Sequence, residues 1–267
     1  YSILALDFSR SIFVGDGVND VVAGAQAYID ATLDAAADGL PHKLAILAFG
    51  APERLELLSG FTDDRAALSA ALEAARLGGD RGTTDLYGAY IRAIQEVDAQ
   101  GIEGALVERF VVLMTDGTHE AGDTDQLRSI ALTEQRGSDA TIFAVGIDGD
   151  YNPESLRQLA SRDSLYFRVQ DSGGLVDAFE RAAERTLALA RSNYVVGVCT
   201  PVALGAPTLT LEVTSWNDTD SVTLSYPADE LTGELSSCEP REVAERAFRR
   251  PGGPEIWIDP HQAEAGD

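Results

Sequence analysis

Apolar and polar positions alternate over the first two thirds of the chain in the manner of strands covered by helices. Unbroken apolar runs at 3–6, 110–115 and 141–147 predict strands buried on both faces. Apolar residues at helical spacing predict helices at 18–36 and 64–77. The same reasoning adds strands at 43–49, 54–58 and 166–169 and helices at 85–99, 124–136, 153–160 and 174–190. This order predicts an α/β fold, with a doubly wound, mostly parallel open sheet flanked by helices.

The ends of some of these helices carry recognisable signals. Thr62 and Asp63 precede the helix at 64–77 and are interpreted as its caps. Pro153 lies in the first turn of the helix at 153–160, where its missing N–H costs nothing.

The pattern changes after residue 191. Runs at 194–198, 208–213 and 221–226 are rich in β-forming residues, and turn signals rather than a helix separate them. We therefore predict a main domain over 1–192, a small antiparallel β appendage over 193–240, and a short helix followed by an extended arm over 241–267.

Both cysteines, Cys199 and Cys238, fall in the appendage. A disulfide between them is predicted, and two unpaired buried thiols are the alternative. A disulfide would indicate an extracytoplasmic location, such as the cell surface, the periplasm or the secreted fraction, because such bridges rarely persist in a reducing cytosol.

The first strand ends in an Asp-x-Ser-x-Ser loop formed by Asp7, Ser9 and Ser11. Three oxygen-bearing side chains at alternate positions of a tight turn can converge on one point, and hard divalent cations prefer oxygen ligands. The alternative is an ordinary turn, in which Asp and Ser bond their own backbone. Taken alone, the loop leaves both interpretations open.

Two later segments change this balance. Thr83 and Thr84 precede a predicted helix, and Asp116 directly follows the apolar run at 110–115. Ligands of parallel sheets gather beyond the carboxyl ends of the strands, where Asp7 and Asp116 both lie. The three segments together indicate a cation site at that edge of the sheet.

With these residues in order, the chain resembles the von Willebrand factor type A (vWA) domain and its metal-ion-dependent adhesion site (MIDAS). The resemblance covers roughly residues 1 to 191, and the stretch at 146–153 is similar to bacterial members. It implies a Rossmann-like vWA fold and a divalent metal cofactor, with Mg²⁺ expected and Mn²⁺ or Ca²⁺ as alternatives.

The resemblance also implies a role for each metal residue. Ser9 and Ser11 would be direct ligands, and Asp7 and Asp116 would act mainly through coordinated water. Thr84 would be the ligand that switches between direct and water-mediated contact. Thr83 fits less well, because the family threonine immediately precedes a residue–leucine pair that begins a helix.

Net charge excludes some partners. The chain has 20 basic and 44 acidic residues, which gives a net charge of −24. Nucleic acid and anionic membrane surfaces both require clusters of Lys and Arg, so neither is an expected partner. The sequence has no apolar stretch of the roughly 20 residues that a membrane-spanning helix needs. It starts directly in a predicted strand, and any targeting segment is expected to have been removed or never included. Solubility or a saline environment is the simpler explanation of the acidity.

Four further features are candidates for metal or ligand binding: the run at 148–152, Phe8, Arg10 and His119. The run at 148–152 resembles the start of a calcium loop, but Pro153 stands where such a loop needs Gly, so a helix-capping turn is favoured. Phe8, Arg10 and His119 are candidates for the ligand-facing rim of the metal site. A solvated charge is the alternative for Arg10, and a surface histidine is the alternative for His119. The three histidines show no zinc-type spacing, and no Ser-His-Asp arrangement is indicated.

The leading functional hypothesis is a non-enzymatic module for metal-dependent protein binding. In this hypothesis an acidic side chain of a partner protein, or of another subunit of the same assembly, completes the coordination of the metal. The alternative is a structural subunit of a surface or secreted assembly, in which the metal only stabilises loops. A cytosolic partner of a chelatase-type ATPase is a third interpretation. The family resemblance further implies a switch that couples Thr84 to displacement of the helix at 174–190.

Overall fold

The computed structural model of the protein describes residues 1–14, 17–102, 106–148, 153–192, 208–215 and 218–225. The chain divides into two compact units, one holding Tyr1–Asn193 and the other holding a β-hairpin. Each unit is described by itself. The predicted domain boundary between residues 192 and 193 stays a prediction. The predictions for Cys199, Cys238, 194–198 and 241–267 concern residues outside the described part of the chain.

The large unit is built on a six-stranded sheet with the strand order β3-β2-β1-β4-β5-β6. All neighbouring strands pair in parallel except β3, which is antiparallel to β2. The strands are β1 (Ser2–Asp7), β2 (Leu44–Phe49), β3 (Glu56–Thr62), β4 (Phe110–Thr115), β5 (Thr141–Ile147) and β6 (Tyr166–Val169). Every residue of β1, β2 and β4 is buried, as their unbroken apolar runs predict.

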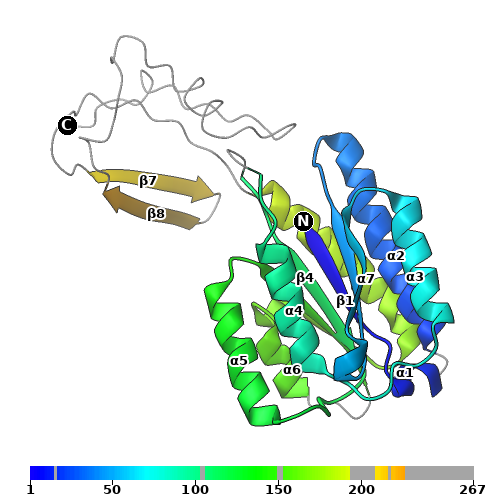
Figure 1. Cartoon of the computed structure of the whole chain (residues 1–267). Coiled ribbons are helices and arrows are strands. Elements are labelled where there is room, and N and C mark those ends of the chain that lie inside the picture. Colours follow the sequence, from blue (N-terminus) through cyan, green and yellow to red (C-terminus); the bar gives the residue numbers. More distant parts are fainter. Residues whose placement is uncertain (15–16, 103–105, 149–152, 193–207, 216–217, 226–267) are drawn as a thin grey trace, which may run out of the picture. The chain divides into compact units, whose positions relative to one another are not determined.

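Helices cover both faces of this sheet, so the predicted doubly wound fold is confirmed. Figure 1 shows α4 passing in front of the sheet and α7 behind it. Helix α2 packs against α3 and α7, and α5 packs against α4 and α6. The helices are α1 (Arg10–Val14), α2 (Val18–Asp34), α3 (Arg65–Leu77), α4 (Leu86–Asp98), α5 (Thr124–Gly137), α6 (Pro153–Leu159) and α7 (Leu175–Arg191). Four short 3₁₀ turns complete the unit at Ala35–Asp38, Pro52–Arg54, Asp163–Leu165 and Ser172–Gly174.

The cap of α3 corrects one sequence prediction. Asp64, rather than Asp63, is the N-cap, and its carboxylate accepts hydrogen bonds from the backbone N–H groups of Ala66 and Ala67. The hydroxyl oxygen of Thr62 accepts a hydrogen bond from the backbone N–H of Asp64. The sequence pattern placed the cap one residue too early, because two adjacent aspartates precede the helix; Asp64 has the extended backbone that is typical of an N-cap.

Strand β3 and helix α1 also differ from expectation. The strand begins at Glu56 and continues to Thr62, past the predicted range of 54–58, and its pairing with β2 contains two register shifts. Such irregularities disturb the alternation of apolar and polar positions that marks a strand in the sequence. The short helix α1 was not predicted, because five residues are too few to show a helical period.

The second unit contains a two-stranded antiparallel sheet. Strands β7 (Thr208–Ser215) and β8 (Asp218–Ser225) pair along their whole lengths. The predicted strands at 208–213 and 221–226 are therefore confirmed as an antiparallel pair with slightly different ends.

No helix among the described residues combines the length and apolarity needed to cross a membrane.

Candidate functional site

Three loops meet at the carboxyl ends of β1 and β4. The loop after β1 carries Asp7, Ser9 and Ser11, the loop before α4 carries Thr84, and the loop after β4 carries Asp116. Backbone hydrogen bonds fasten the first two loops together, from the N–H of Arg10 to the carbonyl of Gly82 over 2.9 Å. Gly82 has a φ of +85°, a left-handed conformation that few other residues adopt without strain. The sheet edge therefore brings the three predicted segments to one place.

Asp7 is the buried centre of this group. Its side chain is fully buried, and its Oδ1 accepts a hydrogen bond of 2.8 Å from the backbone N–H of Ser9. Its Oδ2 accepts a hydrogen bond of 2.5 Å from the hydroxyl of Thr115. Burial raises the pKa of the Asp7 carboxyl to about 7, these hydrogen bonds oppose that rise, and the nearby charge of Asp116 adds to it. The site thus holds a costly carboxylate with a second one close by.

The two serines connect the carboxylates. The hydroxyl groups of Ser9 and Ser11 lie 3.1 Å apart, and the Ser11 hydroxyl donates a hydrogen bond of 2.7 Å to Oδ1 of Asp116. Ser9 is 2% exposed, whereas Ser11 is exposed and begins the side of the group that faces solvent. The structure therefore brings Asp7, Ser9, Ser11 and Asp116 into one hydrogen-bonded chain.

Thr84 lies beside this hydrogen-bonded group of side chains, and it is 3% exposed. A Cβ built on Gly117 would come within 3.1 Å of the Thr84 hydroxyl oxygen, so the hydroxyl lies against the residue that follows Asp116. Its backbone carbonyl accepts a hydrogen bond of 2.8 Å from the N–H of Glu120. Among the described residues the Thr84 hydroxyl has no hydrogen-bond partner, which leaves its oxygen available to another ligand.

The chemistry of this donor set fits a hard divalent cation. All the side-chain donors are carboxylate or hydroxyl oxygens, which Mg²⁺, Mn²⁺ and Ca²⁺ prefer over nitrogen and sulfur. Among the described residues, Asp7 forms no ion pair with Lys, Arg or His, so its buried charge lacks a counter-charge from the protein. No group of three or more His, Cys, Asp or Glu side chains arranged for a metal occurs in the described part of the chain. The present set differs from such a group, because it has two carboxylates and its other donors are hydroxyl oxygens.

Two of the predicted rim residues are buried. Phe8 is 0% exposed and packs with its ring centroid 6.4 Å from that of Phe13, so its rim assignment is wrong. The His119 side chain is 1% exposed and lies against Asp85 and Tyr87, so it is neither a surface histidine nor directed toward an external ligand. Arg10 is exposed, which leaves it as the rim candidate.

The sequence did not single out Thr115, which holds the Asp7 carboxylate. This threonine is the last residue of β4, and in the sequence it looks like part of an ordinary buried strand. Its hydroxyl oxygen also accepts a hydrogen bond of 3.1 Å from the N–H of Gly117, so it braces the turn after Asp116. A polar residue at the carboxyl end of a buried apolar run is the signal that could have identified it.

The remaining sequence candidate for a metal is the run at 148–152. Residues 149–152 fall outside the described part of the chain. The Asp148 carboxylate forms two hydrogen bonds with the Arg168 guanidinium, at 2.5 and 3.0 Å.

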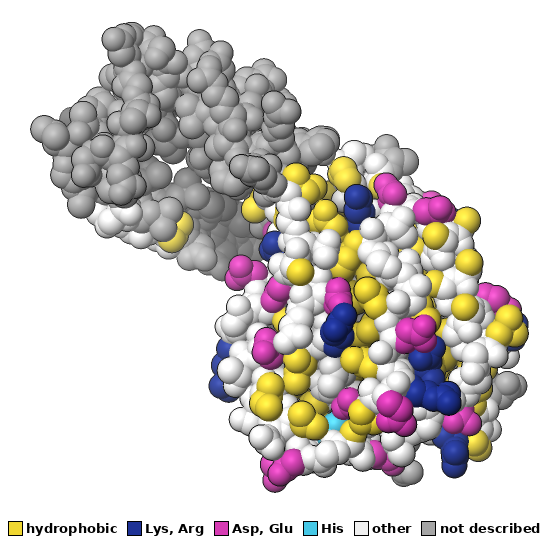
Figure 2. Space-filling model, in the orientation of Figure 1, with side chains coloured by type: hydrophobic (Ala, Val, Ile, Leu, Met, Phe, Trp, Pro, Cys, Tyr) yellow, Lys and Arg dark blue, Asp and Glu magenta, His cyan; other side chains and the backbone are white. Residues whose placement is uncertain are grey.

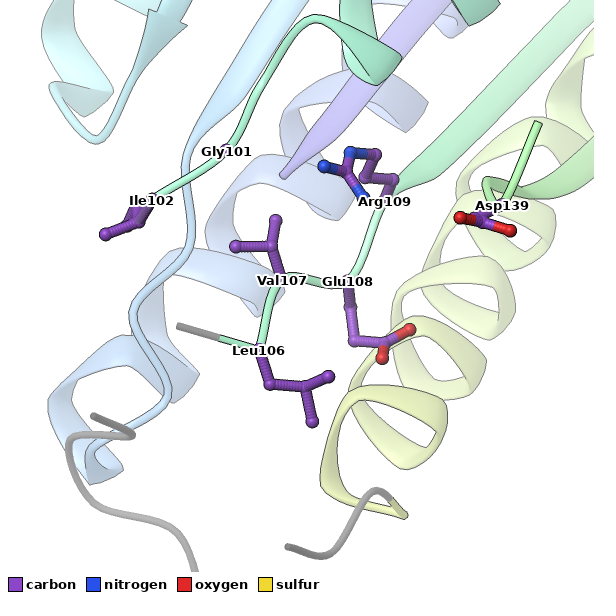
Figure 3. A pocket seen from close by; sticks show the side chains of 7 residues that line it. All are labelled: Gly101, Ile102, Leu106, Val107, Glu108, Arg109 and Asp139. Atoms are coloured by element: carbon purple, nitrogen blue, oxygen red, sulfur yellow. The ribbon is translucent and has the colours of Figure 1, made fainter. Parts of the chain in front are cut away.

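A separate pocket of about 380 Å³ lies at the other end of the sheet. Figure 3 shows it beside the segment before β4, with Val107 below the Arg109 guanidinium and with Ile102 and Asp139 on opposite sides of the view. It adjoins the amino ends of the strands, whereas the oxygen-rich group lies at their carboxyl ends. The site is thus defined by converging donors and not by the size of a cavity.

The described residues form no basic patch on the face shown in Figure 2. On the side shown in Figure 2, Lys and Arg side chains occur singly or in small groups among acidic ones. Among the described residues several arginines pair with carboxylates, as Arg65 does with Asp30 and Asp34.

Comparison with solved structures shows the same fold in several proteins. The vWF domain of the type V pili tip protein Mfa5 from Porphyromonas gingivalis matches with a TM-score of 0.59 and 15% identity, over 73% of this chain and 97% of that one. Proximal thread matrix protein 1 from the mussel byssus matches with a TM-score of 0.58 and 15% identity, over 69% of this chain. A von Willebrand factor type A protein from Catenulispora acidiphila matches with a TM-score of 0.57 and 18% identity, over 85% of this chain.

The shared region is only part of some of these proteins. The alignment spans 47% of the mussel protein and 55% of the Catenulispora protein. One structure of the mussel protein has zinc in its MIDAS motif. No curated protein sequence matches the chain.

The family model of the von Willebrand factor type A domain matches residues 32–181. This range begins after the Asp7–Ser11 loop and includes both Thr84 and Asp116. The match covers more than half of the chain, and the solved vWA structures share the overall fold. The chain therefore belongs to the von Willebrand factor type A domain family, as its sequence motifs predicted.

Proposed function

We propose that this protein is a module for metal-dependent protein binding, in which a divalent cation at the MIDAS receives a carboxylate from a partner protein. One observation carries the proposal. Five oxygen-bearing side chains from three loops meet at the carboxyl edge of the sheet, around a buried carboxylate that has no counter-charge among the described residues. Mg²⁺ is the proposed resident ion, with Mn²⁺ and Ca²⁺ as alternatives.

Each residue has a proposed role. Ser9, Ser11 and Thr84 offer hydroxyl oxygens as direct ligands. Asp7 and Asp116 supply negative charge and orient the serines, through the bonds from the Ser9 N–H and the Ser11 hydroxyl. When bound, the cation supplies a coordination position that a carboxylate of the partner can fill.

The overall charge supports a cation-bridged interface. A chain with a net charge of −24 repels an acidic partner, and a divalent ion placed between two carboxylate-bearing surfaces offsets that repulsion. Exposed Arg10, next to the ligand serines, is proposed to favour an acidic group on the partner. The proposed module is not an enzyme, because its chemistry requires only coordination and no proton transfer.

We also propose an extracytoplasmic location. Members of the family are known for metal-dependent adhesion, and two of the solved structures with this fold come from a pilus tip and from mussel byssus. The proposed disulfide between Cys199 and Cys238 would be consistent with that location.

Metal binding is tested by calorimetric titration of the metal-stripped full chain with Mg²⁺, Mn²⁺ and Ca²⁺. We expect saturable one-site binding in the wild type and its loss in Ser9→Ala/Ser11→Ala. The matched control is Ser129→Ala/Ser164→Ala, which removes two exposed hydroxyls away from the site. Identical titrations for the wild type and the Ser9/Ser11 variant would contradict the proposal.

Partner binding is tested separately, with the proteins that the wild type retains from its native source in the presence of the bound ion. Chelation and Asp7→Ala should both release such a partner. Retention under both conditions would show that the interaction does not use the metal.

The second candidate function is a structural subunit of a surface or secreted assembly, and the β7–β8 hairpin favours it. A two-stranded sheet is marginally stable alone, and Val222 in this hairpin is 48% exposed. In this function, strand addition at the hairpin or the C-terminal arm would make the main contacts. Deleting residues 241–267 should then abolish assembly, whereas metal-dependent binding in the first function should survive the deletion.

The switch implied by the family resemblance stays a prediction. Thr84 would exchange between direct and water-mediated contact while α7 moves. Structures determined with and without a bound ligand test it, and an unmoved α7 would refute it.

A further inference from the structure

The first turn of α4 uses an acceptor from a different loop. The opening N–H groups of a helix have no partner within the helix, and side chains from outside it can satisfy them. Asp85 is the N-cap of α4, and its Oδ1 accepts a hydrogen bond of 3.0 Å from the N–H of Gly88. The N–H of Tyr87 donates instead to Nδ1 of His119, over a long distance of 3.5 Å. His119 therefore acts as a second cap for this helix, supplied by the loop after β4.

The imidazole is enclosed where it makes this contact. Its ring centroid lies 4.7 Å from that of Tyr87, and its Nδ1 lies 3.6 Å from Oδ1 of Asp85. The side chain is 1% exposed. Burial lowers the pKa of the imidazole, and Asp85 and the carbonyl of Ala121 partly offset that effect. A buried ring held on two sides has little freedom to move, so it can fix the distance between its own loop and α4.

The two segments that His119 joins are the ones that carry Thr84 and Asp116. Thr84 lies directly before the N-cap of α4, and Asp116 lies three residues before His119. The loop after β4 also contacts Thr84 itself. The Glu120 N–H donates a hydrogen bond of 2.8 Å to the Thr84 carbonyl, and Gly117 lies beside the Thr84 hydroxyl. The loop after β4 therefore meets Thr84 at Gly117 and Glu120 and meets Tyr87 at His119, so it bears on the position of the Thr84 hydroxyl relative to Asp116.

We infer that His119 is a positioning residue of the metal site, which caps α4 from the neighbouring loop and thereby holds the Thr84 hydroxyl in place for the cation. The inference rests on the proposed function and deepens it. It assigns His119 a supporting role, in which it orients a metal ligand without contacting the metal. This role replaces the ligand-facing and surface positions considered from the sequence. Residues that orient metal ligands from behind commonly change metal affinity by about 10-fold to 100-fold when they are mutated.

Two substitutions separate the capping bond from the packing of the ring. His119→Phe keeps a ring against Tyr87 and removes the acceptor nitrogen. His119→Asn removes the ring and keeps a hydrogen-bond acceptor, because the amide oxygen lies near the position of Nδ1. Calorimetric titration of the full chain with Mg²⁺ should give an affinity about 10-fold weaker for the Phe variant, and within about threefold of the wild type for the Asn variant. Equal affinities for the Phe variant and the wild type would overturn the inference.

A double-mutant cycle tests whether the effect passes through Thr84. Mutations that act on one shared interaction are not additive, whereas independent ones are. We expect His119→Phe to cause no further loss of Mg²⁺ affinity in the Thr84→Ala background. Fully additive losses would overturn the inference, and so would an equal loss in the Phe and Asn variants.

The outcomes also separate this inference from the proposed function. If the wild type shows no saturable Mg²⁺, Mn²⁺ or Ca²⁺ binding, the proposed function fails and this inference fails with it. If the wild type binds and loses binding in Ser9→Ala/Ser11→Ala, while His119→Phe changes nothing, only the inference about His119 fails.

Discussion

The two ends of β1 hold two buried polar groups with opposite character. At the amino end, the Ser2 hydroxyl lies 2.7 Å from Nε2 of His42 and 2.9 Å from the hydroxyl of Tyr28, which in turn lies 2.9 Å from that of Thr186. At the carboxyl end of the same strand, Asp7 accepts hydrogen bonds from two donors and has a second carboxylate nearby. Ser2 and Asp7 are both fully buried, so burial alone does not distinguish them.

The two groups differ in hydrogen-bonding capacity and in charge. Hydroxyls and a neutral imidazole both donate and accept, so the amino-end group satisfies its own hydrogen bonds and carries no charge. Burial keeps it neutral, since it lowers the pKa of His42 to about 3 and raises that of Tyr28 to about 12. Ionised carboxylates only accept, so the carboxyl-end group keeps surplus negative charge. The first arrangement stabilises the fold, and the second is suited to a cation.

The largest expected effect is that of Asp7→Asn, which makes the carboxyl end resemble the amino end. Removing the charge should weaken Mg²⁺ affinity at least about 100-fold. It should also raise the melting temperature of the metal-free protein at pH 8, because a buried unpaired carboxylate is costly. Calorimetry and thermal unfolding measure the two effects. A metal-free variant that melts below the wild type would show that the Asp7 charge does not destabilise the metal-free protein.

The next effect concerns acid and the amino-end group. The pKa of His42 is about 3 in the folded chain and about 6.5 when unfolded. Between pH 6.5 and pH 3 the His42 imidazole is therefore protonated in the unfolded state and neutral in the folded state. The free energy of unfolding accordingly falls as the pH drops from 6.5 toward 3. At pH 4.5 the loss from His42 is about 2–3 kcal/mol.

Urea unfolding at pH 7.5 and 4.5 measures this loss, with His42→Gln as the variant that cannot titrate. Other ionisable groups contribute equally to both proteins, so the difference between the two pH dependences isolates His42. Identical pH dependences would refute the assignment.

A smaller effect is expected when Ser2 is replaced. Ser2→Ala removes the hydroxyl that His42 and Tyr28 share, and it should lower the free energy of unfolding by about 2 kcal/mol. Mg²⁺ affinity should stay at the wild-type value, because Ser2 lies at the far end of β1 from the metal residues. A parallel loss of Mg²⁺ affinity would show that the two ends are coupled.

The smallest expected effect is that of Thr115→Val, which keeps the shape of the side chain and removes its hydroxyl. Asp7 would lose one of its two donors, and Mg²⁺ affinity should fall about 10-fold. Thr115→Ser retains the hydroxyl and should bind within about threefold of the wild type. If both variants bind equally well, the hydroxyl of Thr115 has no part in holding Asp7.

Much of the fold could be predicted because its signals are local. The apolar runs that became β1, β4 and β5 are unbroken, and the Asp-x-Ser-x-Ser loop is a contiguous motif. The directions of side chains were not predictable in the same way. Phe8 and Ser9 are neighbours in one loop, and only the tertiary structure shows that the Phe8 ring belongs to the buried core.

Residues that act across loops were also beyond the sequence. Nothing near His119 in the chain shows that its imidazole will reach the first turn of α4, because that contact spans 32 residues. Thr115 supports Asp7 from 108 residues away. The bulges of β3 were missed for a related reason, since they are a property of its pairing with β2.

Those bulges have a consequence for the behaviour of the protein at high concentration. An open sheet has two edges, and a long straight edge strand is a template on which other chains aggregate. Here one edge is β3, with two register shifts, and the other is β6, with only four residues. Neither edge presents the long regular row of backbone groups that a second sheet needs for pairing. The large unit is therefore expected to resist the edge-to-edge aggregation to which open sheets are prone.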